Sequence, residues 1–261
     1  MRGLPVAPKH ALGQHFLADE NILRVIGRLA ALAPGDVVLE IGPGLGTLTT
    51  FLADRVRLVH AVEIDRSLEP VLAERLAPHG NVRLRYGDAL RLDLAVLEPA
   101  PTKLVSNLPY NVATPIVVES LDGLPSVGLW CVMVQREVAD RLFAEPGTKA
   151  YGAVSVLVQL ATERTGFHAV SREVFRPRPR VDSALVAFER RQLPERYAHV
   201  KRVVGAAFAH RRKTLPNSLA LAGIASRDQA ERALATLGRP ATTRAEALRP
   251  PDFVTLAALL P

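Results

Sequence analysis

A short polar motif, Ser106-Asn107-Leu108-Pro109-Tyr110, contains groups that could hold a planar amine. The Asn107 amide offers a hydrogen-bond acceptor, and the Tyr110 ring offers a flat face for stacking. Pro109 fixes its own φ and favours an extended Leu108, so the backbone carbonyls here can point outward. An ordinary strand-to-helix turn uses the same residue types, so the motif alone leaves both interpretations open.

A second pattern predicts a ligand that contains adenosine. An apolar strand, residues 37–41, runs into the glycine turn Gly42-Pro-Gly-Leu-Gly46 and then into helical residues. The next strand ends in Glu63, which lies 21 residues after Gly42, the separation typical of a carboxylate that accepts ribose hydroxyls. Asp88 follows a third strand, where it could accept from an adenine amino group or cap a helix that follows. Both acids lie where open α/β sheets bind ligands.

The glycine spacing indicates which ligand this is. The dinucleotide fingerprint has a third glycine three positions after the second, but Thr47 occupies that position here. The segment from Glu40 to Gly46 instead resembles the first motif of methyltransferases that use S-adenosylmethionine. We therefore favour S-adenosylmethionine over NAD as the predicted cofactor.

The order of the elements predicts an α/β fold. Strand candidates at 37–41, 58–64, 82–86, 103–106, 127–134 and 184–189 alternate with helix candidates, which predicts a Rossmann-like sheet with helices on both faces. Residues 149–160 are a further helix candidate, while 167–170 has no clear pattern. Beyond residue 193 the periodicity is helical only. We expect a main domain over residues 1–192 and a small helical domain over 193–261.

The composition is that of an ordinary globular protein, with 48% hydrophobic and 23% charged residues among 261. No apolar run approaches the length of a membrane span, and the first residues lack the apolar core of a signal peptide. The single cysteine, Cys131, can form no internal disulfide. We expect a cytoplasmic protein without membrane association.

Positive charge is concentrated in one block. The net charge is +7, and residues 170–215 hold 12 Lys and Arg against 4 Asp and Glu, whereas the rest of the chain is nearly balanced. Alternating prolines keep residues 175–183 extended, so that Arg176, Arg178 and Arg180 project from the loop. Such a block is typical of a face that binds nucleic acid, although a solvated basic surface would have the same composition.

Other chemistries lack their motifs. The seven histidines and the cysteine have no metal-ligand spacing, so we expect no metal site. Neither a Gly-x-Ser-x-Gly elbow nor a phosphate-binding Gly-Lys-Ser/Thr loop is present. The predicted cofactor pocket beside Asn107 fits methyl transfer to an exocyclic amine. Asn107 and the Leu108 or Pro109 carbonyl would hold the two amine hydrogens, and Tyr110 and Phe175 would stack on a flipped base.

Motifs along nearly the whole chain resemble the small-subunit ribosomal RNA adenine dimethyltransferases, the KsgA family. The matching stretches are Leu12-Gly-Gln-His-Phe-Leu17, Glu40 to Gly46, Asn107-Leu-Pro-Tyr-Asn111, Gln135-Arg-Glu-Val138, Ala150-Tyr-Gly152, Phe175 to Ser183 and Ala207 to Leu215. The resemblance implies a class I methyltransferase domain with an appended helical domain. It also implies dimethylation of two adjacent adenosines in the 3′-terminal hairpin of 16S rRNA, within an assembling 30S subunit.

The resemblance also assigns residues. It implies cofactor contacts at His15, Leu17, Gly42, Gly44, Glu63, Asp88 and Asn107. The family often has asparagine at the position of His15, and a basic residue at the position of Pro216. For RNA binding we predict Arg176, Arg178, Arg180, Arg211, Arg212 and Lys213.

Two alternative functions stay open. An erythromycin-resistance methyltransferase shares the fold and the asparagine motif but acts on 23S rRNA. A ribosome assembly factor of little catalytic activity could retain the pocket. The sequence does not determine the order of methyl additions, the domain that docks first or the oligomeric state, for which we expect a monomer.

Overall fold

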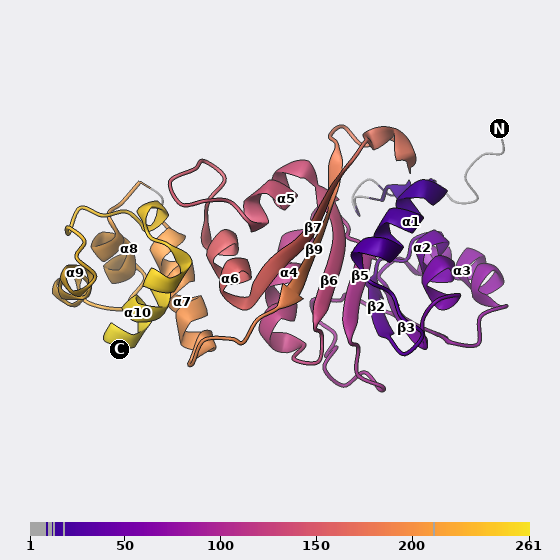
Figure 1. Cartoon of the computed structure of the whole chain (residues 1–261), viewed down its shortest axis with the longest axis horizontal. Helices are drawn as coiled ribbons and strands as arrows, with labels where there is room; N and C mark the ends of the chain where they lie inside the picture. Colours follow the sequence, from indigo (N-terminus) through magenta and orange to yellow (C-terminus); the bar gives the residue numbers. More distant parts are fainter. Residues whose placement is uncertain (1–8, 10–11, 13, 18, 211) are drawn as a thin grey trace. The chain divides into compact units, whose positions relative to one another are not determined.

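The computed structural model describes residues 9, 12, 14–17, 19–210 and 212–261 and divides the chain into two compact units (Figure 1). The first unit combines the described residues up to Ala139 with Glu163–Arg190, and the second combines Asp140–Thr162 with Arg191–Pro261. The chain passes from the first unit into the second for the last time between Arg190 and Arg191, whereas the predicted boundary is at residue 193. The helical unit is nevertheless larger than predicted, because residues 140–162 pack with the C-terminal helices.

The first unit is built on a mixed sheet. Among the described residues this sheet has seven strands, in the order β4-β3-β2-β5-β6-β9-β7. The strands are β2 (Val37–Ile41), β3 (Leu58–Glu63), β4 (Val82–Tyr86), β5 (Lys103–Asn107), β6 (Leu129–Gln135), β7 (Thr162–Val170) and β9 (Ser183–Arg190). β2 to β6 pair in parallel, and β9 is antiparallel to β6.

The central strands were predictable because both of their faces are buried. All five residues of β2 are buried, which is why this strand reads as a continuous apolar run interrupted only by Glu40. β7 is different: it lies at the edge of the sheet, and most of its residues between Thr162 and Val170 are exposed or half-buried. Its sequence is therefore largely polar, which explains why residues 167–170 showed no pattern.

Helices cover both faces of the sheet (Figure 1). On one face, α1 (Glu20–Leu29) and α2 (Thr47–Ala53) pack with Val38, Val59 and Val105. On the other, α4 (Ala113–Gly123) is tied to β6 by a hydrogen bond of 2.8 Å from Trp130 Nε1 to Ser120 Oγ. The predicted arrangement of helices on both faces is confirmed.

Shorter elements complete this unit. They are β1 (Phe16–Leu17), η2 (Arg66–Leu68), α3 (Glu69–Leu76), η3 (Arg172–Val174), β8 (Phe175–Arg176) and α5 (Arg136–Leu142), which continues into the second unit. β1 and β8 form a separate antiparallel pair. Residues 90–97 form turns and irregular structure between β4 and β5. Within the described part of the chain, no helix could cross a membrane.

The second unit is helical. It contains α6 (Ala153–Ala161), α7 (Tyr197–Phe208), α8 (Leu215–Leu221), α9 (Arg227–Thr236), η4 (Ala245–Ala247) and α10 (Pro250–Leu259). The Tyr151 hydroxyl donates to Leu248 O at 2.8 Å, which ties the inserted segment to the C-terminal helices. Pro216 stands in the first turn of α8, where its missing N–H breaks no helical hydrogen bond.

Candidate active site

The sheet topology creates the crevice in which the predicted site residues meet. The chain builds β2, β3 and β4 outward and then returns to place β5 on the other side of β2. Connections on opposite sides of such a switch point leave a crevice at the carboxyl ends of the strands. Ser106 Oγ donates to Ile41 O at 2.6 Å and holds the ends of β5 and β2 together. A cavity opens here, lined by residues that follow β2, β3 and β5 and by the N-terminal segment.

The glycine loop is closely packed on both sides. Gly42 and Gly44 have φ angles of +77° and +59°, a region that favours glycine. A Cβ on Gly44 would lie 2.9 Å from Phe16 Cδ1, and one on Gly42 would lie 3.1 Å from Pro109 Cγ. Both predicted glycines line the cavity, and no larger residue fits at Gly44 without displacing Phe16.

Glu63 stands at the end of β3 with both carboxylate oxygens facing backbone donors. Gly44 N donates to Oε2 at 3.1 Å, and Asp65 N donates to Oε1 at 2.8 Å. Burial raises the pKa of Glu63, and these N–H donors partly oppose that rise. Glu63 lines the cavity, and a carboxylate oxygen can accept more than one hydrogen bond, as a ribose-binding carboxylate requires.

Glu40, which stands in the quoted motif without a predicted role, lines the same cavity. Its side chain is buried, and its Oε2 has no hydrogen-bond partner among the described residues. Burial raises the pKa of Glu40 to about 8, and the nearby Glu63 adds to the rise. Among the described residues that line the cavity, two are glutamates and none is Lys or Arg. The two carboxyl groups can accept hydrogen bonds from a cationic ligand, and no described Lys or Arg of the lining is available to pair with a pyrophosphate.

The N-terminal segment is fastened across the cavity by Asp65, a residue without a predicted role. Lys9 Nζ pairs with Asp65 Oδ1 at 2.6 Å, and Gln14 Nε2 donates to Oδ2 at 2.9 Å. Burial alone would raise the pKa of Asp65, but hydrogen bonds from Lys9, Ser67 and Gln14 outweigh it and lower that pKa. His15 and Leu17, both predicted cofactor contacts, line the cavity as a result.

The amide of Asn107 has a defined orientation. Its Nδ2 donates to His15 O at 3.1 Å, so Oδ1 faces away from that bond, and no described residue donates to it. The Pro109 carbonyl accepts from Val112 N at 3.1 Å, whereas no described turn or loop donor occupies the Leu108 carbonyl. Asn107 Oδ1 and Leu108 O are therefore the available acceptors beside the cavity.

Tyr110 lies between two cavities. It lines the first together with His15, and the same two residues line a second cavity with Gln135, Arg178 and Arg180. The rings of His15 and Tyr110 are 5.4 Å apart and tilted by 32°. A flat ring therefore lines both the predicted cofactor pocket and a cavity flanked by arginines.

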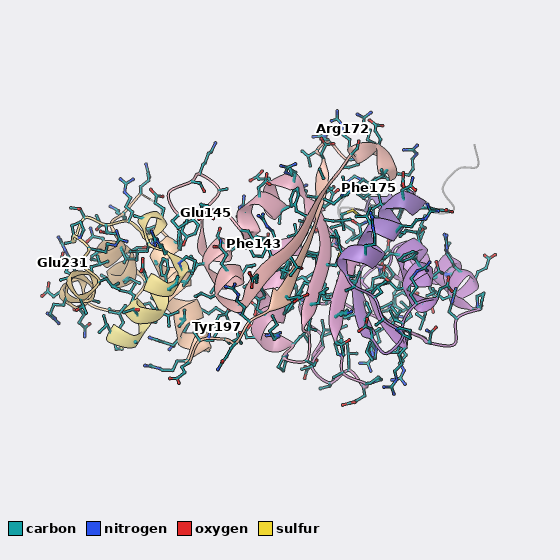
Figure 2. The ribbon with its side chains drawn as sticks, in the orientation of Figure 1. Phe143, Glu145, Arg172, Phe175, Tyr197 and Glu231 are labelled. Carbon is teal, nitrogen blue, oxygen red and sulfur yellow. The ribbon has the colours of Figure 1, made fainter. Side chains whose placement is uncertain are left out.

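Phe175 does not take the predicted stacking role. Its side chain is fully buried in the core with Leu17, its partner in the β1–β8 pair, and it lines neither cavity. Figure 2 labels Phe175 at the end of the sheet where Arg172 also lies. The apolar ring has been used for packing, so the aromatic neighbour of Tyr110 is His15 instead.

Asp88 lies outside the set of residues that line the cavity. Its Oδ1 accepts from Leu90 N at 3.0 Å, and its Oδ2 lies 3.4 Å from Arg91 Nε. The structure thus shows the turn-capping role of Asp88, and its adenine contact stays a prediction.

The predicted RNA-binding residues fall into two groups. Arg178 and Arg180 line the second cavity, whereas Arg176 is exposed nearby and its guanidinium donates to Glu173 O and Phe175 O. Arg212 and Lys213 are exposed between α7 and α8 of the helical unit, and Arg211 lies outside the described residues. In the described chain no cluster of His, Cys, Asp or Glu has the geometry to hold a metal ion.

Comparisons with known proteins agree on one family. The family model for ribosomal RNA adenine dimethylase matches residues 7–259. The chain is similar to ribosomal RNA small subunit methyltransferase A of Rubrobacter xylanophilus, with 51% identity covering 98% of this chain and 96% of that protein. The protein of the same name from Thermobifida fusca is 45% identical, covering 97% of this chain and 91% of its own length.

Solved structures show the same fold. A 23S rRNA methyltransferase, ErmE, superposes with a TM-score of 0.67 at 30% identity, covering 94% of this chain and 99% of that chain. A dimethyladenosine transferase from Plasmodium falciparum has a TM-score of 0.77 at 24% identity, covering 93% and 96% of the two chains. The latter likeness supports the fold alone.

Replacing Glu40 with glutamine should change how stability depends on pH. The raised pKa means that the folded state favours the protonated carboxyl. The contribution of Glu40 to folding stability is therefore complete below the unfolded pKa of 4.5 and is lost as pH rises toward about 8. Without added ligand, the free energy of unfolding of the Glu40→Gln variant should rise relative to that of the wild type across this pH window, by up to a few kcal/mol. Urea unfolding at pH 5, 6.5 and 8 measures this. The control Glu195→Gln, at an exposed position, should leave the pH dependence of stability as in the wild type. If stability depended on pH in the same way for Glu40→Gln and the wild type, the burial effect would be refuted.

Replacing Asp65 with asparagine should weaken binding of the predicted cofactor, S-adenosylmethionine. The variant loses the carboxylate charge that pairs with Lys9 and one of the two oxygens that accept from Lys9 and Gln14. The segment with His15 and Leu17 is therefore held less firmly against the cavity. We expect the dissociation constant from calorimetry to rise about tenfold, the usual effect of a charged hydrogen bond. Asp54→Asn, at an exposed ion pair with His79, is the matched control. If Asp65→Asn and the wild type bound S-adenosylmethionine with equal affinity, Asp65 would not be needed to hold this segment at the cavity.

Proposed function

The chain belongs to the ribosomal RNA adenine dimethylase family, and we propose that it transfers methyl groups from S-adenosylmethionine to N6 of two adjacent adenosines in the 3′-terminal hairpin of 16S rRNA. As a member of this family it is an rRNA adenine dimethyltransferase. The proposal includes action on the assembling 30S subunit in the cytoplasm, by a monomer.

The position of Tyr110 and Asn107 is the observation that carries this proposal. Both line the acidic cavity that holds Glu63 and the glycine loop, and Tyr110 also lines the cavity flanked by Arg178 and Arg180. The acceptors for an amine thus lie between a pocket suited to a cationic cofactor and a surface suited to a polyanion.

The cofactor fits the residues present. Glu63 would accept the ribose hydroxyls, Gly42 and Gly44 line the cavity beside it, and the buried Glu40 carboxyl would gain a cationic partner. When bound, S-adenosylmethionine supplies an electrophilic methyl group on a positively charged sulfur. Asp88 is the proposed acceptor for the adenine amino group, provided that its carboxylate leaves the local turn.

Asn107 and Leu108 prepare the amine for reaction. The N6 lone pair of adenine is delocalised into the ring and is a poor nucleophile. If Asn107 Oδ1 and Leu108 O each accept one N6 hydrogen, the lone pair turns out of the ring plane and toward the cofactor pocket. A bound S-adenosylmethionine would supply the methyl group to N6 held in this way, and the proton that N6 loses would pass to water. This is catalysis by positioning and electrostatics.

Tyr110 replaces the stacking that a base loses when it leaves the RNA helix. Arg176, Arg178 and Arg180 are the proposed phosphate contacts of the first unit. The helical unit supplies Arg212, Lys213 and, beyond the described residues, Arg211. We propose that this unit recognises the ribosomal particle.

The relatives favour the small subunit as the target. Proteins named for small-subunit methylation are up to 51% identical to this chain, against 30% for the 23S rRNA methyltransferase ErmE. The available acceptors at Asn107 and Leu108 favour a catalytic role over that of an inactive assembly factor.

Purified protein should methylate under-modified 30S particles. With radiolabelled S-adenosylmethionine, we expect N6,N6-dimethyladenosine in the 3′-terminal hairpin of 16S rRNA, identified by nuclease digestion and chromatography. Labelling of naked 23S rRNA instead would move the assignment to the erythromycin-resistance class. Cofactor binding without labelling of either RNA would favour the assembly factor. As a control, Tyr110→Ala should retain cofactor affinity while its turnover falls strongly.

Removal of charge from the helical unit should flatten the salt dependence of RNA binding. For the Arg212→Ala/Lys213→Ala variant, the slope of log K against log salt should decrease by about 1 to 2, since each phosphate contact contributes about 0.7–0.9. Arg227→Ala/Arg239→Ala removes the same charge from arginines paired with Glu231 and Asp252, so its slope should match the wild type. An unchanged slope in the first variant would place the RNA elsewhere.

A further inference from the structure

We propose that Ser183 is a positioning residue for Tyr110 and that it fixes the Tyr110 ring relative to the loop that carries the arginines. The inference rests on the proposed function, because it assigns Tyr110 to the target base. Ser183 had no predicted chemical role. The inference gives it one and explains why the loop that carries Arg178 and Arg180 joins β9 at this residue.

Ser183 is a buried polar residue whose hydroxyl is hydrogen-bonded to Tyr110. It is the first residue of β9, it is only 1% exposed, and the residues that follow it, Ala184 to Phe188, are fully buried. Its Oγ lies 2.6 Å from Tyr110 Oη, and this is the hydrogen bond of its side chain in the described structure. A buried hydroxyl needs such a partner, since an unpaired one is costly.

The Tyr110 hydroxyl is suited to this bond. Burial raises the pKa of Tyr110, and Asp182 adds to the rise while the Ser183 hydrogen bond opposes it. The phenol therefore stays neutral at physiological pH and can donate or accept. With its hydroxyl fixed, the ring keeps one orientation at the boundary of the two cavities.

The loop from Pro177 to Asp182 is linked to Tyr110 at both of its ends, through Ser183 at one end and through His15 at the other. Its last residue, Asp182, is followed directly by Ser183. Its first residue, Pro177, has its carbonyl 2.8 Å from His15 Nδ1, so this nitrogen must carry the hydrogen. The His15 ring in turn packs against the Tyr110 ring, with centroids 5.4 Å apart.

The loop is itself braced. Asp182 O accepts from Arg136 N at 3.0 Å, and Asp182 Oδ1 accepts from Arg172 N at 3.1 Å. The Arg172 guanidinium also donates to Arg180 O at 3.1 Å. A phosphate held by Arg178 or Arg180 is thereby placed at a set distance from the ring that receives the base. Such positioning acts on the bound complex, so it should affect turnover more than cofactor binding.

The experiment is a double-mutant cycle with Ser183→Ala and Tyr110→Phe, each of which removes one hydroxyl and keeps the ring. Each variant should lower kcat on 30S particles about tenfold while leaving the dissociation constant for S-adenosylmethionine unchanged. Because both remove the same bond, the double variant should be no worse than either single one. Ser183→Thr retains the hydroxyl and should recover most of the activity.

Ser218→Ala is the matched control, since Ser218 is also a fully buried serine whose hydroxyl donates once, to Ala206 O at 2.7 Å. It should keep the wild-type kcat. Thermal unfolding of every variant separates lost stability from lost positioning. Wild-type kcat in Ser183→Ala, or additive losses in the double variant, would overturn the proposal. Failure of the wild type to label 16S rRNA refutes the proposed function instead, and the cycle is then read on whichever RNA is labelled.

Discussion

The reversal of strand order between β2 and β5 is the constraint on which the rest of the site depends. It brings the glycine loop after β2 and the Asn107 motif after β5 to the same crevice, and Ser106 Oγ holds the two strand ends together at Ile41 O. The close approach of Pro109 to Gly42 follows from this geometry. Acceptors for an amine therefore stand beside the proposed cofactor pocket although 65 residues separate Gly42 from Asn107.

Opposite electrostatic characters meet within a short distance at Tyr110. The cavity with Glu40 and Glu63 has no described Lys or Arg in its lining, while Arg178 and Arg180 flank the cavity on the other side of the ring. A cationic methyl donor and an anionic RNA are each attracted to one side. The N-terminal segment, anchored at Asp65, and the arginine loop, joined at Ser183, both contact this boundary and hold it in place.

Predictions from the sequence succeeded where the signal was local. Apolar runs located the central strands, because strands buried on both faces have no polar side to obscure them. β7 was missed because an edge strand is mostly exposed and polar. Phe175 was misassigned because an aromatic residue before an arginine loop serves equally well in a core, and only packing shows that it contacts Leu17. Asp65 carried a weak signal, as an acid two residues after Glu63, but its partners Lys9 and Gln14 are far away in sequence.

The sequence by itself determined the α/β fold, the cofactor loop with its acid at Glu63 and the chemistry available at Asn107. These depend on residue types at fixed spacing, which the chain carries without reference to its folded form. Only the tertiary structure decided that the Pro109 carbonyl accepts from Val112 N, that Glu40 is buried with its Oε2 unpaired among the described residues, and that the Ser183 and Tyr110 hydroxyls are hydrogen-bonded. Each of these depends on which groups become neighbours and which lose water on folding, and residue spacing along the chain does not specify that.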